Sequence, residues 1–222
     1  MSLAPILHKV PLFADLSELE IARIAEVARE RTYLKNSVIL FEDDPGDALY
    51  VVETGSVKVV LIGEDGREVI LSVLDEGDFF GEMALIDDEP RSAHVIAMED
   101  AVMLVLRRED FFHRLREAPT IALGLLKTLT RRLREADEKI GGLVLLDVPG
   151  RVARLLLRMA DENDGAEITR KVTHHTIAQM VGSSRETVSR TMRDLVDKGL
   201  VEVSRKTITL KDRRALESMG GR

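Results

Sequence analysis

The chain has 222 residues, enough for one large domain or two modest domains with separate cores. Its 45% apolar and 32% charged residues are typical of a soluble globular protein, and no apolar run approaches the roughly 18 residues of a membrane span. There is no cysteine, which excludes disulfides, thiolate zinc sites and Cys-ligated iron–sulfur clusters. The first residues lack the pattern of a secretory signal, so we expect the cytoplasm as the compartment.

The net charge of −7 hides an asymmetry between the two halves of the chain. Residues 150–222 carry 15 Lys and Arg against 10 Asp and Glu, a balance of +5. Residues 1–149 carry 17 and 29, a balance of −12. This division predicts a C-terminal half that faces nucleic acid and an acidic N-terminal half with another task.

The N-terminal half is predicted to form a helix followed by antiparallel β structure. Residues 17–30 repeat apolar side chains at helical spacing behind Ser17, a good N-cap with Glu20 three positions on. From Val38 to Leu106, short apolar runs alternate with Gly- and Asp-rich turns, which predicts an antiparallel barrel or roll. Residues 80–85 interrupt these strands and predict a single helical turn.

A long helix is predicted beyond residue 107. Seven apolar residues are spaced alternately by four and three positions: Ala122, Leu126, Leu129, Leu133, Ala136, Ile140 and Leu143. With its charged flanks, this stripe predicts a two-helix dimer seam; the alternative is a helix packed on its own domain. Proline and glycine in residues 147–150 predict a hinge, and a second helix is expected from Arg151 to about Asn163.

Residues 172–195 predict two short helices joined by a tight turn at residues 182–184, with Arg185 and Glu186 opening the second helix. This pattern is typical of a helix that reads the major groove of DNA. Residues 201–203 and 207–210 predict a hairpin, or wing, that places Arg205 or Lys206 near phosphates. The adjacent pair His174 and His175 is explained more simply by exposed positions near DNA than by a metal site.

Four segments in this order resemble the cyclic AMP receptor protein and fumarate–nitrate regulator family of bacterial transcription factors, nearest to the cyclic AMP branch. They are PGDALYVVETGSVKV (45–59), FGEMALIDDEPRSA (80–93), RRLREADEKIGGLVLLDVPGRVARLLL (131–157) and AQMVGSSRETVSR (178–190). The resemblance implies an α+β fold: a cyclic-nucleotide-binding β-roll (jelly-roll-like) over 1–118, a dimerisation helix and hinge over 119–147, and a winged helix-turn-helix domain over 148–222. It further implies a homodimer that binds a palindromic TGTGA-like site in double-stranded DNA and contacts RNA polymerase, to activate or to repress.

The segment 80–93 has the chemistry of an anion site. Gly81 allows a close backbone approach, while Arg91 and Ser92 suit a phosphate. Glu82 fits beside an anion if it accepts a ribose hydroxyl proton, which points to a cyclic nucleotide held non-covalently; the alternative is a surface salt bridge between Glu82 and Arg91. The resemblance assigns the same roles. The predicted ligand-binding residues are Gly81, Glu82, Met83, Ala84, Arg91, Ser92, Ala93 and Asp137.

The chain departs from the family pattern on the long helix. Where members that bind cyclic AMP usually present Thr and a second polar residue to the adenine, this chain has Ala136 and Asp137. Asp137 either accepts a hydrogen bond from the adenine amine or is a solvated charge beside Arg134. Cyclic AMP is the expected effector; another nucleotide such as cyclic di-GMP, or action without a ligand, is the alternative.

In the DNA-reading helix, Arg185 is placed to donate two hydrogen bonds to guanine, Glu186 to accept from cytosine, and Arg190 to reach a further guanine or a phosphate. The alternative is that both arginines contact phosphates alone. The predicted DNA-binding residues are Thr173, Ser184, Arg185, Glu186, Thr187, Ser189, Arg190, Arg193 and Lys206. The sequence shows no P-loop, nucleophile–base pair or metal-ligand cluster, so we expect neither an enzyme nor a metal site.

Overall fold

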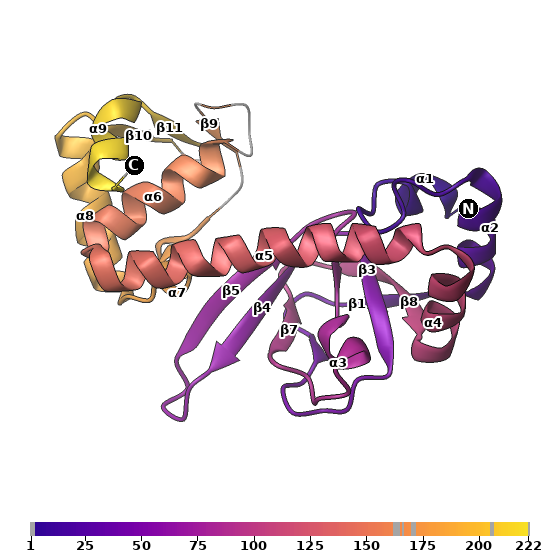
Figure 1. Ribbon diagram of the computed structural model, residues 1–222. Helices are drawn as coiled ribbons and strands as arrows, with labels where there is room; N and C mark the ends of the chain where they lie inside the picture. The colour runs from indigo at the N-terminus through magenta and orange to yellow at the C-terminus, as the bar shows by residue number, and fades with distance from the viewer. Residues whose placement is uncertain (1–2, 162–164, 166, 170–171, 205–206, 222) are drawn as a thin grey trace. The chain divides into compact units, whose positions relative to one another are not determined.

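The computed structural model describes residues 3–161, 165, 167–169, 172–204 and 207–221. Its contacts divide the chain into two compact units, Met1–Leu133 and Arg134–Arg222. The boundary falls inside the longest helix, α5 (Thr120–Leu145), which contributes residues to both units (Figure 1). Each unit has its own buried apolar core.

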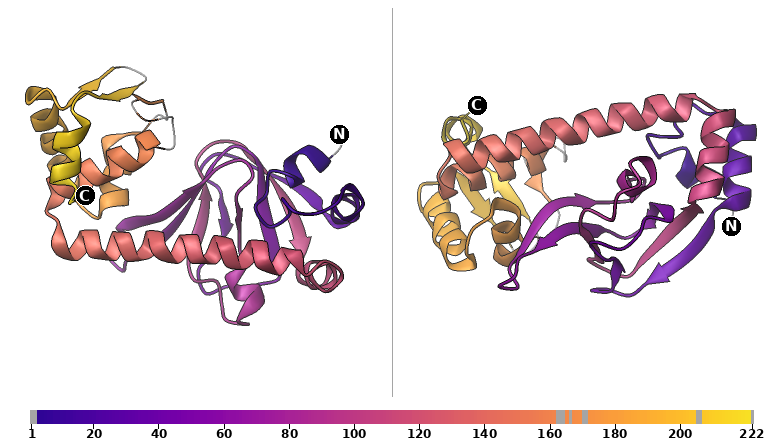
Figure 2. Two further views of the ribbon diagram at one scale, coloured as in Figure 1. Left: turned by 45° about the horizontal axis from the view of Figure 1, so that its top comes forward. Right: turned by 60° about the horizontal axis from the view of Figure 1, so that its bottom comes forward.

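The first unit is built around two antiparallel sheets of four strands, which confirms the predicted β-roll. One sheet has the order β1-β8-β3-β6: Arg29–Tyr33, Ala101–Arg107, Ala48–Thr54 and Phe79–Phe80. The other has the order β2-β7-β4-β5: Val38–Leu40, His94–Ala97, Val57–Ile62 and Glu68–Leu74. Figure 2 shows the strands from two further directions.

Helices close one end of the roll. These are α1 (Ala4–Leu7), α2 (Glu18–Val27) and α4 (Arg108–Glu117), which lie together with the start of α5 (Figures 1 and 2). The core between these helices and the sheet contains Phe13, Phe79, Phe111 and Ile121, each at most 1% exposed. A short helix, α3 (Met83–Ile86), follows β6 and carries the predicted ligand segment.

Two boundaries of the first unit differ from the sequence prediction. The helix after Ser17 has the expected capping box with Glu20, but it ends at Val27 rather than at residue 30, because Arg29 begins strand β1 and pairs with Val105. The predicted turn of residues 80–85 is also shorter. Phe80 belongs to β6, and α3 starts only at Met83, since Gly81 has a φ of +84°, outside the right-handed helical region.

The second unit confirms the predicted winged helix-turn-helix. After α5 come α6 (Val148–Asp161), β9 (Glu167–Ile168), α7 (His174–Val181), α8 (Arg185–Asp197), β10 (Val201–Val203), β11 (Ile208–Leu210) and α9 (Arg213–Met219). The three strands form one sheet, β10-β11-β9. Neither β9 nor α9 was predicted. The apolar faces of α6, α7 and α8 meet in a core that includes Leu156, Ile177 and Val188, all fully buried.

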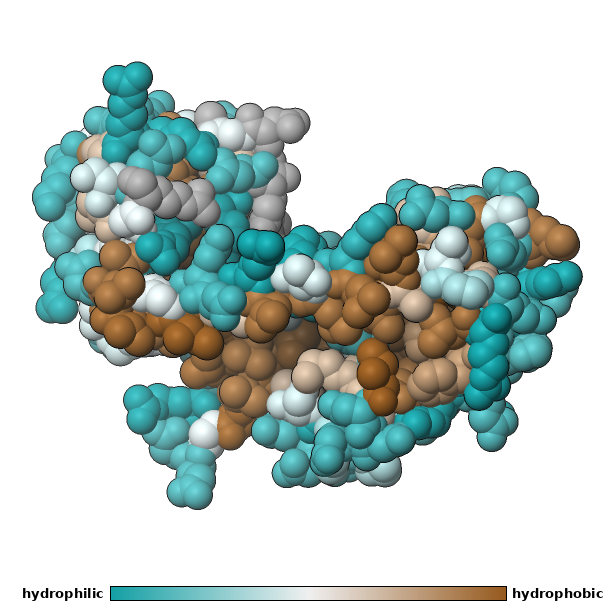
Figure 3. Space-filling model, viewed as in Figure 1, coloured by the Kyte–Doolittle hydropathy of each residue, from teal (hydrophilic) through white to brown (hydrophobic). Residues whose placement is uncertain are grey.

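Helix α5 exposes much of the predicted seam. Leu126 and Leu133 in the first unit are 59% and 62% exposed, and Ile140 and Leu143 in the second are 60% and 56% exposed. Figure 3 shows apolar side chains along the part of α5 in the first unit and over the strands beside it. Among the described residues, no helix combines the length and the apolar character needed to cross a membrane.

Candidate nucleotide site and DNA-reading surface

Arg91 is a buried cation beneath the turn that joins β6 to α3. Its side chain is 4% exposed, and it donates to the carbonyl oxygens of Gly81 at 2.7 Å and Ala48 at 3.0 Å. Burial lowers the pKa of Arg91, while the neighbouring Tyr50 and Asp47 act in the opposite direction. Because two carbonyl dipoles and the Asp47 carboxylate at 3.6 Å surround the guanidinium, its charge is compensated within the protein.

Glu82 has a different cation as its partner. Arg132 of α5 donates from Nη1 to Glu82 Oε1 at 2.8 Å and from Nη2 to the carbonyl oxygen of Phe79. The guanidinium also lies 4.7 Å from the centre of the Phe79 ring, within the range of a cation–π contact. Glu82 is 3% exposed, so its carboxylate depends on this partner. The surface salt bridge considered for Glu82 and Arg91 is therefore not the arrangement found, because both side chains are buried.

Sequence reasoning missed Arg132. It lies in the RRLREADEKI segment, where it was counted only as a charged flank of the seam, and its partner is 50 positions away. The sequence held no signal for this pair, because Arg91 was the cation considered for Glu82 and the burial of the carboxylate is known only from the structure.

Two glycines bring the backbone of this site into close contact. A Cβ on Gly81 would lie 2.7 Å from Arg91 Nη1 and 3.1 Å from the Ala48 oxygen. A Cβ on Gly46 would lie 2.4 Å from the Cβ of Ala84. Gly81 thus allows the close approach expected of it, and the group that approaches is Arg91. Any larger residue at either position must displace α3 or its neighbours.

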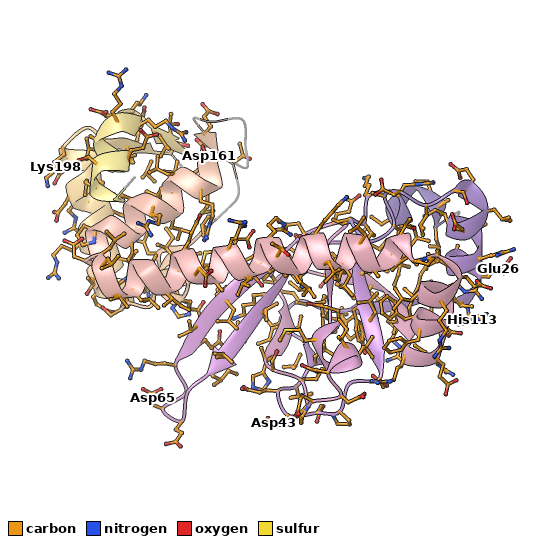
Figure 4. All side chains as sticks on the ribbon, viewed as in Figure 1. Glu26, Asp43, Asp65, His113, Asp161 and Lys198 are labelled. Atoms are coloured by element: carbon orange, nitrogen blue, oxygen red, sulfur yellow. The ribbon has the colours of Figure 1, made fainter. Side chains whose placement is uncertain are left out.

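The remaining predicted ligand residues of the first unit surround α3. Met83 is 50% exposed, Ala84 and Ala93 are buried, and the exposed Ser92 places its hydroxyl 3.9 Å from Met83 Sδ. The loop after β2, where Figure 4 labels Asp43, is joined to this segment by hydrogen bonds from Asp43 N to the Arg91 oxygen and from Arg91 N to the Asp44 oxygen. Asp137 is exposed on the part of α5 that belongs to the second unit, whereas the other predicted ligand residues belong to the first.

The helix-turn-helix forms from local signals. Thr173 caps α7 by accepting a hydrogen bond from Thr176 N at 3.0 Å, and Gly182 ends it with a left-handed φ of 62°. Ser184 caps α8 by accepting from Thr187 N at 3.1 Å. These caps fix the turn at the predicted residues and start α8 at Arg185.

Helix α8 has one buried face and one exposed charged face. Apolar residues at helical spacing on the two helices are buried: Ala178, Val181, Val188, Met192 and Leu195. Arg185, Glu186, Arg190 and Arg193 are exposed, while Thr187 and Ser189 are half-buried. Hydrogen bonds from its own N–H and from Ser184 lower the pKa of Glu186. The charged face therefore remains available to a ligand.

The remaining predictions for this surface concern the wing and the pair His174 and His175. Arg205 and Lys206, the predicted phosphate contacts of the wing, lie outside the described residues. His174 bonds to Ser189 of α8 through Nδ1 at 2.9 Å. Within the described part of the chain, no group of three or more His, Asp or Glu side chains is arranged to hold a metal ion.

Two family models match the chain. The cyclic nucleotide-binding domain matches residues 30–118, and the Crp-like helix-turn-helix domain matches residues 150–219. Together they define a DNA-binding regulator with a nucleotide-sensing domain.

Relatives and solved structures agree with this class. The chain is 35% identical to the cyclic AMP receptor protein of Thermus thermophilus over 209 residues, covering 94% of this chain and 96% of that protein. It is 30% identical to the CRP-like cAMP-activated global transcriptional regulator of Mycobacterium tuberculosis, covering 95% and 96%. The chain belongs to the Crp/Fnr family of transcriptional regulators.

Two solved structures of regulators are similar to this chain over most of its length. The c-di-GMP responsive regulator CLP of Xanthomonas campestris has a TM-score of 0.76 and 26% identity, with 88% of this chain and all of that chain covered. The catabolite activator protein of Thermus thermophilus has a TM-score of 0.56 and 35% identity, with 95% and 98% covered. Members of the family are dimeric DNA-binding regulators and not enzymes.

Proposed function

We propose that the protein is a homodimeric transcription regulator that binds cyclic AMP between α3 and α5 and then recognises a palindromic site with TGTGA-like half-sites. It would act where the chromosome lies, in the cytoplasm, and regulate through contact with RNA polymerase. The functional division proposed is a sensor over residues 1–118, a dimerisation helix and hinge over 119–147, and a DNA-binding domain over 148–222.

The observation that carries the proposal is the pair of buried, opposite charges on the segment around α3. Arg91 lies 2.7 Å from the oxygen of Gly81, and Glu82 is the next residue in the chain, 3% exposed. A cyclic nucleotide presents an anionic phosphate and a ribose hydroxyl side by side, which matches a carboxylate on this turn and a cation that hydrogen-bonds to it. Ser92 and the N–H groups of residues 83 and 84 complete the proposed phosphate contacts, with Met83 and Ala93 beside the sugar.

Titration calorimetry with the purified protein tests the ligand. We expect cyclic AMP to bind, and Arg91→Gln and Glu82→Gln each to weaken binding by roughly 10- to 100-fold, because a hydrogen bond to a charged group contributes about 1.5–3 kcal/mol. Glu89→Gln, an exposed carboxylate on the same loop, serves as the control and should bind as the unchanged protein does. Failure of every nucleotide to bind would show that the roll is only a scaffold.

The departure from the family pattern at residues 136 and 137 of α5 favours a second candidate effector. Ala136 offers no hydrogen bond where a base contact is expected, and Asp137 accepts only. A structurally similar regulator responds to cyclic di-GMP. The same titration therefore includes cyclic GMP and cyclic di-GMP. Tighter binding of either than of cyclic AMP would reassign the effector while leaving Arg91 as the phosphate contact.

The DNA contacts of α8 are tested by a binding selection. Arg185→Ala should cost about 1–3 kcal/mol at one base pair and relax the preference for guanine there. Lys198→Ala, just after α8, is a matched control that removes an exposed charge beyond the other end of the helix. If Arg185→Ala lowers affinity equally for all sequences, Arg185 contacts phosphate only.

A further inference from the structure

A single hydrogen bond joins the beginning of α7 to the middle of α8. His174 is the first residue of α7, and its Nδ1 lies 2.9 Å from the hydroxyl oxygen of Ser189, part-way along α8. The caps of both helices are complete without it, since Thr173 and Ser184 supply them. The bond therefore has no part in starting either helix.

Ser189 belongs to the face of α8 that carries the charged residues. It lies four positions after Arg185 and four before Arg193, both exposed, and residues at this spacing share one side of a helix. Val188 and Met192, on the adjoining side, are buried in the core, and Ser189 is half-buried at the edge between the two. The His174 ring is thus within hydrogen-bond distance of the stripe assigned to DNA.

The ionisable groups near α7 come from three elements. On α7 itself there is the exposed His175. The ionisable residues of α8 are Arg185, Glu186, Arg190, Arg193, Asp194 and Asp197. The carboxylate of Glu186 is engaged at its own N–H and at Ser184.

On α6, the charged residues are three arginines and Asp161, which pairs with Arg213. Arg151 donates to the carbonyl oxygens of Val181 and Leu146, and Arg154 donates to those of Gly220 and Glu138. The third is Arg158. Glu186 and Asp161 are already engaged within the chain, and the hydrogen-bond partner of the His174 ring is the neutral Ser189. A positive ring at His174 can therefore take an anion from outside as its partner.

We propose that His174 is a DNA-contacting residue that couples operator binding to proton uptake. Nδ1–H donates to Ser189, which fixes the ring, and Nε2–H donates to a backbone phosphate. With both nitrogens donating, the ring is the imidazolium form. The proposal rests on the assignment of α8 to DNA and adds to it a phosphate contact outside that helix.

The direction of the pH effect follows from the phosphate. A phosphate oxygen beside the ring favours the protonated imidazole, so the DNA complex binds more protons than the free protein. Affinity for DNA should then rise as the pH falls. A dimer places one such group at each half-site.

The test is the pH dependence of DNA affinity, measured by fluorescence anisotropy with the full chain, saturating effector and a labelled duplex at constant ionic strength. Between pH 6 and pH 8 we expect affinity to fall by up to about tenfold per half-site. His174→Gln should lose this dependence and bind weakly at pH 6. Ser189→Ala keeps the histidine but frees its ring, and should show a smaller dependence. His175→Gln is the matched control and should follow the unchanged protein.

Two results would overturn the proposal: a His174→Gln variant with the full pH dependence, or a His175→Gln variant that loses it. These are distinct from failure of the DNA assignment itself. If Arg185→Ala still alters base preference while His174→Gln changes nothing, only the role of His174 falls. If the unchanged protein binds no duplex at any pH, the assignment of α8 falls with it.

Discussion

Lys139 on α5 is a cation in an environment that disfavours its charge. Burial is the larger cause and the nearby Arg158 the smaller, and together they lower the pKa of Lys139 to about 8, although Glu135 acts in the opposite direction. In the unfolded chain a lysine titrates near pH 10.4. Between these values the unfolded state binds more protons than the folded state, so the free energy of unfolding should increase as pH rises.

We therefore expect the stability of the unchanged protein relative to Lys139→Met to improve from pH 7.5 to pH 10. Urea unfolding at fixed protein concentration measures this difference. Lys127→Met removes an exposed lysine of the same helix and is the control. Parallel pH profiles for the unchanged protein and Lys139→Met would contradict the expectation.

At the level of single residues, sequence reasoning worked where a role is set by near neighbours. The turn at residues 182–184 and the start of α8 at Arg185 follow from local capping and periodicity, and both were predicted correctly. The pairing of Arg132 with Glu82 was not predictable, because it depends on how α5 packs across β6. The ligand and DNA roles of the predicted residues stay predictions.

Among the elements, α6 and α9 pack so closely that a methyl group has no room between them. A Cβ on Gly150 would lie 2.8 Å from the carbonyl oxygen of Met219 and 3.1 Å from Asp147 Oδ1. Gly150→Ala should destabilise the DNA-binding unit by about 1–3 kcal/mol, the usual cost of overpacking, as measured by thermal unfolding.

Gly141→Ala is the matched control for this change. Gly141 lies in α5 and is not one of the seam residues, and a Cβ added to it would meet no heavy atom of the described chain within 4 Å. Replacement by alanine should stabilise the helix by roughly 0.5–1 kcal/mol. Effects of equal sign at both positions would show that packing against α9 is not the cause.

The elements that sequence patterns missed are short or polar. Strand β1 (RERTY) is exposed along most of its length, and β6 and β9 have two residues each. Their strand conformation is imposed by pairing with β8, β3 and β11, which local propensity does not report. The longer strands, with buried apolar runs, were all predicted.

For the molecule as a whole, the exposed stripe on α5 predicts self-association. Leu133 is 62% exposed in the single chain, a poor position for leucine unless another surface covers it. Leu133→Glu should weaken the proposed dimer by roughly a thousandfold, since two leucines at roughly 2 kcal/mol each are lost. Sedimentation equilibrium measures this.

Lys127→Glu, which reverses an exposed charge on the same helix, is the control and should leave the dimer intact. A Leu133→Glu variant that sediments as the unchanged protein does would place the dimer contact elsewhere. The apolar strands β4 and β5, which expose Ile62 and Val69 at 41% each, are the next surface to test. The tip of their hairpin carries Asp65, which projects away from the roll (Figure 4).

The ion pair between Arg132 and Glu82 has a consequence for signalling. Arg132 is the last residue but one of the first unit, and the second unit begins at Arg134. A molecule that competed for the Glu82 carboxylate would release Arg132, two residues before the second unit begins. Because Arg132 is itself a residue of α5, the effect of such a molecule would reach the helix directly and would need no change in the strands of the β-roll.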